Sequence, residues 1–144
     1  MKQYFDLLLH RIQSSSKNIP VAALLVYKNQ VVVFHVNGTD PLSHAELLVL
    51  KEGIEILGPH MKDAILYVTL EPCAMCRAAI SLSGIKTVYF GAYNDKGVED
   101  ANVMYYGGFY ERECGDVIKA FFRKKKSDAI FNTYLESLHE KTLE

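Results

Sequence analysis

The chain has 144 residues, of which 49% are hydrophobic and 23% are charged, as is ordinary for a folded domain with its own apolar core. We therefore expect residues 1–144 to form a single domain. The net charge of −1 excludes a general attraction to nucleic acid, and no apolar run reaches the roughly 20 residues of a membrane span. Residues 1–11 lack the pattern of a signal peptide, so a cytoplasmic location is expected.

The hydrophobic pattern predicts helices and strands in the order α-β-β-α-β-α-β-α. The helices are expected at 1–13, 43–57, 72–83 and 111–138, and the strands at 21–27, 31–36, 64–70 and 85–90. Lys28-Asn29-Gln30 is predicted to be the tight turn of a hairpin. Residues 91–108 are predicted to be a long loop, and Ser127 is the position where a break in the last helix would fall.

The third predicted strand and the helix after it determine the expected architecture. Residues 64–70 are almost continuously apolar, as in a strand that is buried on both faces. A strand, a helix and a second strand over residues 64–90 imply parallel pairing through a right-handed crossover. The chain is therefore predicted to fold as a three-layer α/β/α domain with a mixed sheet.

Two short stretches at predicted helix starts carry metal-binding chemistry. They are His44-Ala45-Glu46 and Pro72-Cys73-Ala74-Met75-Cys76. Zinc is held by His and Cys side chains, and a catalytic zinc site uses three protein ligands and leaves the fourth position to water. The two cysteines are three residues apart and face the same way on a helix, and a helix N-terminus favours the thiolate that binds metal. We expect His44, Cys73 and Cys76 to bind zinc, with Glu46 left free as an acid or base.

Each part of this pattern also has a plainer interpretation. The Cys-x-x-Cys pair alone would fit a redox site, and Glu46 alone would fit a capping box with Ser43. A closed structural zinc site would need a fourth ligand, for which Cys114, His35 and His60 are the candidates. Together, however, His-x-Glu and Pro-Cys-x-x-Cys form the signature of zinc-dependent nucleobase deaminases, which favours that interpretation.

On these motifs and their surroundings, the chain resembles the bacterial tRNA adenosine deaminases, which convert the wobble adenosine to inosine. The matching segments are Pro20–Val26, Leu66–Cys76, Val88–Ala92 followed by Lys96, and Phe121-Phe122-Arg123. The resemblance implies a cytidine-deaminase-like α/β fold with a mixed five-stranded sheet. It also implies hydrolytic deamination with Zn²⁺ as the cofactor, the anticodon loop of tRNA as the partner, and a homodimer.

The resemblance assigns roles to individual residues. His44, Cys73 and Cys76 would bind zinc and Glu46 would move protons, while Asn37 would hold the target base, Ala45 would be a further substrate-binding residue, and Lys96 and Arg123 would contact RNA. The backbone N–H groups near Glu71 are also candidates to hold the substrate, because a helix start leaves donors free. Asn37 fits a plain turn residue equally well. Four aromatic residues would either stack on bases or pack in the core or a dimer, with packing favoured, namely Tyr93, Tyr105, Tyr106 and Phe109.

The departures from the family pattern surround the pocket and leave the zinc chemistry untouched. The loop between Asn37 and His44 is short, Asn94 stands where the family has aspartate, and Ala78 stands where it has glycine. An alternative substrate is therefore a free base, nucleoside or nucleotide, such as guanine, cytosine, cytidine or deoxycytidylate. A non-catalytic, zinc-stabilised binding module is the other alternative, and Glu46 is the residue that separates it from an enzyme.

Overall fold

The computed structural model describes residues 1–12, 19–94 and 100–143, and for residues 139–143 it describes only the course of the helix. Within these residues the chain forms four α-helices, one short 3₁₀ helix and five strands. In chain order these are α1 (Lys2–Arg11), β1 (Ala22–Tyr27), β2 (Gln30–Val36), α2 (Ala45–Leu57), the 3₁₀ helix (Gly58–Asp63), β3 (Ile65–Leu70), α3 (Ala74–Ser83), β4 (Thr87–Ala92), β5 (Met104–Tyr106) and α4 (Glu111–Leu143). None of the described helices combines the length and the apolar character that crossing a bilayer requires.

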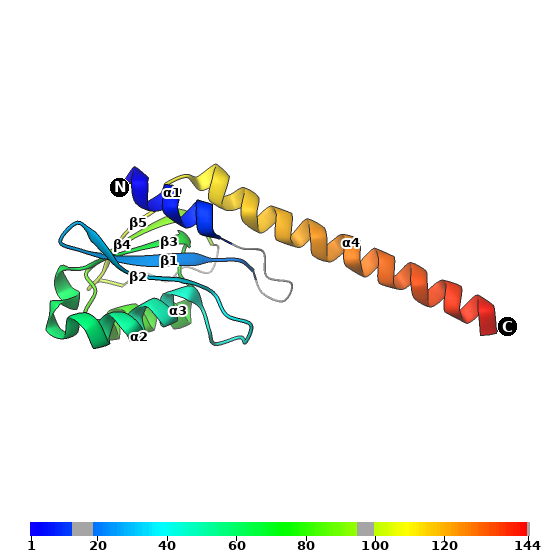
Figure 1. Ribbon diagram of the computed structural model, residues 1–144, viewed down its shortest axis with the longest axis horizontal. Coiled ribbons are helices and arrows are strands. Elements are labelled where there is room, and N and C mark those ends of the chain that lie inside the picture. Colours follow the sequence, from blue (N-terminus) through cyan, green and yellow to red (C-terminus); the bar gives the residue numbers. More distant parts are fainter. Residues whose placement is uncertain (13–18, 95–99, 144) are drawn as a thin grey trace.

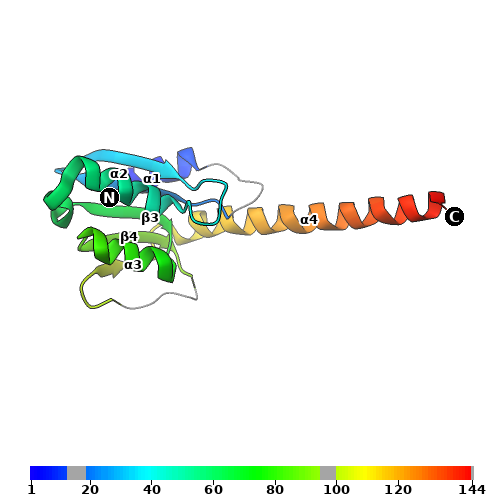
Figure 2. The same cartoon turned by 90° about the horizontal axis from the view of Figure 1, so that it is seen from below.

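The five described strands form one mixed sheet in the order β2-β1-β3-β4-β5. The strand β1 pairs antiparallel with β2 and with β3, whereas β3 with β4 and β4 with β5 pair in parallel. Helices α2 and α3 cover one face of the sheet, and α1 and the beginning of α4 cover the other (Figures 1 and 2). The predicted three-layer α/β/α fold with a mixed five-stranded sheet is therefore confirmed.

The neighbouring strands β1 and β3 in the middle of the sheet place their apolar side chains in two cores, one on each face. Successive residues of a strand point to opposite faces of its sheet. Accordingly, Leu25 and Val68 pack in the core beneath α2 and α3, while Leu24 and Tyr67 pack in the core beneath α1 and α4. Because both faces are covered, these strands can be apolar at almost every position, which is the pattern that predicted a central strand.

The hairpin between β1 and β2 forms where the sequence predicts it. Lys28 and Asn29 both adopt positive φ angles, of 50° and 62°. Two such residues make a turn whose twist matches that of the flanking strands. Gln30, which was predicted to belong to the turn, is instead the first residue of β2.

The structure corrects the sequence prediction in two further places. The predicted loop over residues 91–108 is wrong at its beginning, where β4 continues to Ala92, and near its end, where β5 forms and pairs with β4. A strand of three residues is too short to show a period, so only its pairing with a distant strand reveals it. The helix α4 also continues through Ser127 without a break, since the lysines before it and Ala129 after it favour the helix.

Candidate metal centre and its cavity

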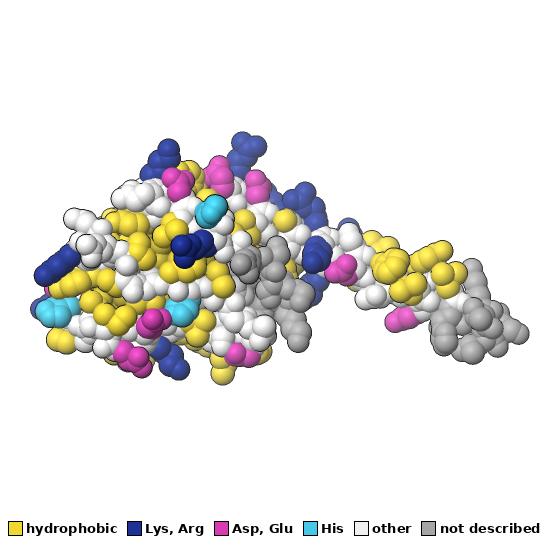
Figure 3. All heavy atoms as spheres, in the orientation of Figure 1, with side chains coloured by type: hydrophobic (Ala, Val, Ile, Leu, Met, Phe, Trp, Pro, Cys, Tyr) yellow, Lys and Arg dark blue, Asp and Glu magenta, His cyan; other side chains and the backbone are white. Residues whose placement is uncertain are grey.

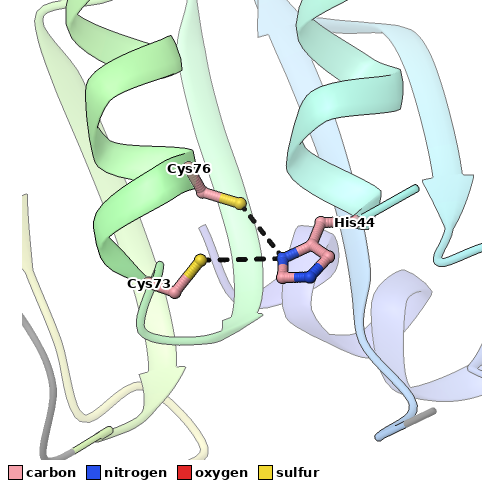
Figure 4. A group of neighbouring side chains, drawn as sticks. All are labelled: His44, Cys73 and Cys76. Carbon is pink, nitrogen blue, oxygen red and sulfur yellow. Dashed lines mark hydrogen bonds between the residues drawn. The ribbon is translucent and has the colours of Figure 1, made fainter. Parts of the chain in front are cut away.

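The three predicted ligands converge from the beginnings of two neighbouring helices (Figure 4). His44 is the N-cap of α2, and Cys73 is the N-cap of α3. The Nδ1 atom of His44 lies 3.4 Å from the Sγ atom of Cys76 and 3.7 Å from that of Cys73. Ligands placed about 2.0–2.3 Å from a tetrahedral zinc ion lie roughly 3.5–3.8 Å from one another. The two distances from His44 therefore fit zinc coordination, and the three ligand atoms all lie within 4.8 Å of one another.

A closed structural site would need a fourth ligand, which the described part of the chain does not bring to this place. The three candidates have other surroundings. His35 pairs with Glu52 on the outer strand β2, His60 lies against the ring of Tyr27, and Cys114 is buried in the core beneath α1 and α4. A site with three protein ligands and one open position is typical of catalytic zinc.

Glu46 occupies the second position of α2 and is only 4% exposed. Burial raises the pKa of this carboxyl, and hydrogen bonding by its own backbone N–H, the nearby His44 and the Cys76 thiol act in the opposite direction. The capping-box interpretation is wrong, because the N-cap is His44 and the Ser43 hydroxyl donates to the carboxylate of Asp40. The side chain of Glu46 therefore does not cap α2, and it lies at the cavity beside the predicted metal ligands.

The environment of the second cysteine shows why this cluster suits a cation. Burial raises the pKa of the Cys76 thiol, and the neighbouring Glu46 and Cys73 raise it further. A buried thiol beside a carboxyl and a second sulfur is disfavoured in its charged form. A divalent cation offsets this effect, and its binding is coupled to loss of the thiol protons. The chemistry of the donor set therefore agrees with its geometry.

The ligands open onto a cavity of about 360 Å³, which is within the usual range for small-molecule sites. The loop after β2, the start of α2, the end of β3, the segment after β4 and one stretch of α4 all contribute to its wall. The lining residues are Ile19, Val21, Asn37, Asp40, Ser43, His44, Ala45, Glu46, Leu70, Glu71, Cys73, Asn94, Phe121, Phe122 and Lys125.

All three residues that were predicted to bind the substrate line this cavity, but two of them also hold the protein together. The amide nitrogen of Asn37 donates to the carbonyl of Ile19 at 3.0 Å, and its oxygen accepts from the N–H of Val21 at 2.9 Å. Asn37 thus secures the entry to β1 and still has one N–H and one oxygen lone pair for a ligand. Both carboxylate oxygens of Glu71 are bonded within the protein, whereas Ala45 contributes a wall position at the first turn of α2.

The two predicted RNA contacts have different outcomes. Lys96 lies outside the described residues. Arg123 is exposed on α4, where its Nε donates to the carbonyl of Lys119 at 3.4 Å. The cavity is lined by three other residues of the same helix, Phe121, Phe122 and Lys125.

Three of the four aromatic candidates pack against their neighbours, as the packing interpretation predicts. Tyr106 stacks on Tyr89, and Phe109 stacks on Phe5. Tyr105 lies beneath the guanidinium group of a buried arginine. The fourth, Tyr93, is 58% exposed and packs edge-on against Phe90.

Sequence reasoning missed several residues of the cavity. Asp40 and Ser43 form a hydrogen-bonded loop at its edge, and the Ser43 hydroxyl holds the pKa of the Asp40 carboxyl below its usual value. Their Asp-Pro-x-Ser sequence signals a turn but does not indicate where the turn lies. The contribution of α4 was missed because which face of a helix meets a cavity depends on how the helix packs on the sheet.

Comparison with known proteins supports the same interpretation. Residues 1–92 match the family model described as the cytidine and deoxycytidylate deaminase zinc-binding region. The chain is 34% identical over 145 residues to a tRNA-specific adenosine deaminase of Agrobacterium fabrum, which covers 87% of this chain and 95% of that protein. It is 36% identical over 132 residues to the tRNA-specific adenosine deaminase of Bacillus subtilis, which covers 77% of this chain and 82% of that protein.

A solved structure from work on A-to-I editing by tRNA:A34 deaminases at the wobble position of transfer RNA is also similar. Its TM-score is 0.61 and its sequence is 34% identical, with 67% of this chain and 83% of that chain covered. The likeness therefore extends from the sequence motifs to the three-dimensional arrangement that holds them.

Proposed function

Because the chain belongs to the zinc-dependent deaminases of the cytidine and deoxycytidylate deaminase family, and within it to the tRNA-specific adenosine deaminases, we propose that it converts the wobble adenosine of tRNA to inosine. The observation that carries the proposal is the buried carboxyl of Glu46 beside three converging metal ligands, where Glu46, His44 and Cys73 line one cavity. A structural zinc protein has no need of such a carboxyl.

The chemistry is hydrolysis at the ring carbon that bears the amino group. Zinc held by His44, Cys73 and Cys76 would lower the pKa of water toward about 7, so that hydroxide is available near neutral pH. Glu46 accepts a proton from the attacking water and carries it to the ring nitrogen. The same residue then protonates the departing amino group, so that adenosine and water give inosine and ammonia.

The wall that α4 contributes supports an RNA substrate. A base in an anticodon loop must leave its stack to reach a cavity of this kind, and aromatic side chains hold such flipped bases by stacking. Phe121 and Phe122 lie at the cavity, and Lys125 brings a positive charge to the same wall. Lys and Arg side chains gather where α4 leaves the globular part (Figure 3). This placement supports contact with the phosphates beside the target base.

The decisive experiment uses the zinc-loaded full chain and an arginine tRNA with an ACG anticodon. We expect inosine at the wobble position, detected by sequencing or by nucleoside analysis. A parallel panel of guanine, cytosine, cytidine and deoxycytidylate is assayed for ammonia release. No inosine, together with ammonia from a member of the panel, would transfer the same chemistry to a small-molecule substrate and contradict the tRNA proposal.

We further propose that residues 1–144 form a single deaminase domain that acts in the cytoplasm as a homodimer. The distal part of α4 supports the dimer. Several large apolar side chains there are more than 40% exposed, namely Ile130, Phe131, Tyr134, Leu135 and Leu138, and hydrophobic surface is visible along this stretch in Figure 3. A helix that leaves its domain with an apolar face needs a partner to cover that face. The partner that we propose is a second copy of the chain.

A further inference from the structure

A buried arginine beside the metal centre has no part in the chemistry above. Arg77 follows Cys76 in α3, and its side chain is 8% exposed. A buried guanidinium group destabilises a fold unless it is paired and hydrogen-bonded. The contacts of Arg77 therefore indicate what the residue does.

Arg77 connects three elements that meet next to the cavity. Its Nη2 donates to the carboxylate of Glu71 at 2.7 Å, and its Nε donates to the carbonyl of Pro72 at 3.2 Å. The guanidinium carbon lies 4.0 Å from the centre of the Tyr105 ring, within the range of a cation–π contact. One side chain on α3 thus holds the segment that follows β3 and the strand β5.

Glu71 extends this connection to the wall of the cavity. Its second carboxylate oxygen accepts from the backbone N–H of Asn94 at 2.8 Å. Its own backbone N–H donates to the carbonyl of Ala92 at 2.8 Å, and both Glu71 and Asn94 line the cavity. The carboxylate therefore lies between Arg77 on one side and the segment that follows β4 on the other.

We propose that Arg77 is a positioning residue that acts through Glu71 to hold the backbone at Asn94 against the cavity. This contact sets how tightly the target base binds, and it leaves the metal ligands in place. The start of α3 is held separately, because the backbone N–H of Arg77 donates to the carbonyl of Cys73 at 2.9 Å whatever the side chain. The inference rests on the proposed deaminase function, and it gives Glu71 a structural task in place of direct contact with the base.

The first test replaces Arg77 by methionine in the zinc-loaded full chain. We expect zinc content to stay at the wild-type level, KM for the tRNA to rise more than kcat falls, and kcat/KM to drop about 10- to 100-fold. Arg112→Met, which changes an exposed arginine on α4, is the matched control and should behave like the wild type.

A double variant separates positioning from simple stabilisation. Arg77→Met alone leaves Glu71 with a largely buried charge that has lost its cationic partner and so lowers stability, whereas Glu71→Met combined with Arg77→Met removes both charges and restores it. The double variant still lacks an acceptor for the N–H of Asn94. We therefore expect its KM to remain raised although its thermal stability recovers. A recovery of KM together with stability would overturn the proposal.

Hydrogen exchange gives a readout that does not depend on any substrate. In Arg77→Met we expect the amide of Asn94 to exchange at least about tenfold faster than in the wild type. The amide of Glu71, which is bonded to Ala92, should keep its protection and serves as the internal control. Unchanged exchange at Asn94 in Arg77→Met overturns the proposal, even if the substrate proves to be a small molecule and the proposed tRNA activity fails.

Discussion

Glu46 contributes little to the buried surface, yet it is the residue that distinguishes a deaminase from a structural zinc protein. Glu46→Gln keeps the shape of the side chain and removes its capacity to accept a proton. We expect zinc content and thermal stability close to those of the wild type, and turnover lower by about 10²- to 10⁴-fold. Glu55→Gln, an exposed position on the same helix, is the control. Turnover of Glu46→Gln within a few fold of the wild type would show that the carboxyl has only a structural role.

The metal centre can be tested by changing one of its cysteines, with the third cysteine of the chain as the matched control. Cys76→Ser removes a ligand, whereas Cys114→Ala changes a buried thiol in the opposite core. We expect metal analysis to show zinc lost from the first variant and retained in the second. A chelator should lower the melting temperature of the wild type, because a bound metal stabilises the folded state by mass action. Equal zinc content in the two variants would contradict the assignment of Cys76.

At the scale of elements, the contact of α4 with the sheet depends on a residue without a side chain. A Cβ atom at Gly91 would lie 2.7 Å from the carbonyl oxygen of Thr69 and would also clash with the thiol of Cys114. The close packing of α4 on β4 is therefore possible only with glycine at this position.

Alanine substitutions at two glycines measure this contact. Gly91→Ala should lower the free energy of unfolding by about 1–3 kcal/mol, because α4 must move away from the strand. Gly115→Ala, in α4 itself, has open space around the new Cβ atom and should raise it by up to about 1 kcal/mol through helix propensity. Chemical denaturation of both variants checks the pair. A neutral Gly91→Ala would show that the helix packs more loosely than described.

At the scale of the whole molecule, the outstanding feature is the length of α4, which runs far beyond the three layers (Figures 1 and 2). An isolated helix is marginally stable in water, and most of its stability in proteins comes from packing of an apolar face. The distal half of α4 therefore supports the proposed homodimer, in which a second copy of the chain would cover its apolar face.

Single charges introduced into this helix test the proposed dimer. Light scattering at micromolar concentration should give a dimer for the wild type and a shift toward the monomer for Leu135→Asp, because a carboxylate in an apolar interface opposes association. Asn132→Asp adds the same charge at a polar position of the same helix and should remain dimeric. A monomeric wild type, or a dimeric Leu135→Asp, would refute this role of α4.

Local sequence patterns were sufficient to predict the metal ligands and most of the helices and strands. His44, Cys73 and Cys76 stand at helix starts with a recognisable spacing, and their chemistry is a property of residue types and short distances along the chain. The same holds for the hairpin at Lys28-Asn29 and for the apolar run of β3. Periodicity and spacing are determined within a few residues, so the sequence by itself displays them.

Tertiary structure alone decided what surrounds those ligands. The strand β5 exists through its pairing with β4, the Glu71 carboxylate at the cavity wall is bonded to Arg77 and Asn94, and α4 supplies Phe121 and Lys125 to the same wall. Each of these facts depends on contacts between segments that are far apart in the chain or on the face that a packed helix presents. The type of reaction could therefore be predicted from the amino-acid sequence, whereas the shape of the cavity beside the metal ligands depends on how the sheet and helices pack.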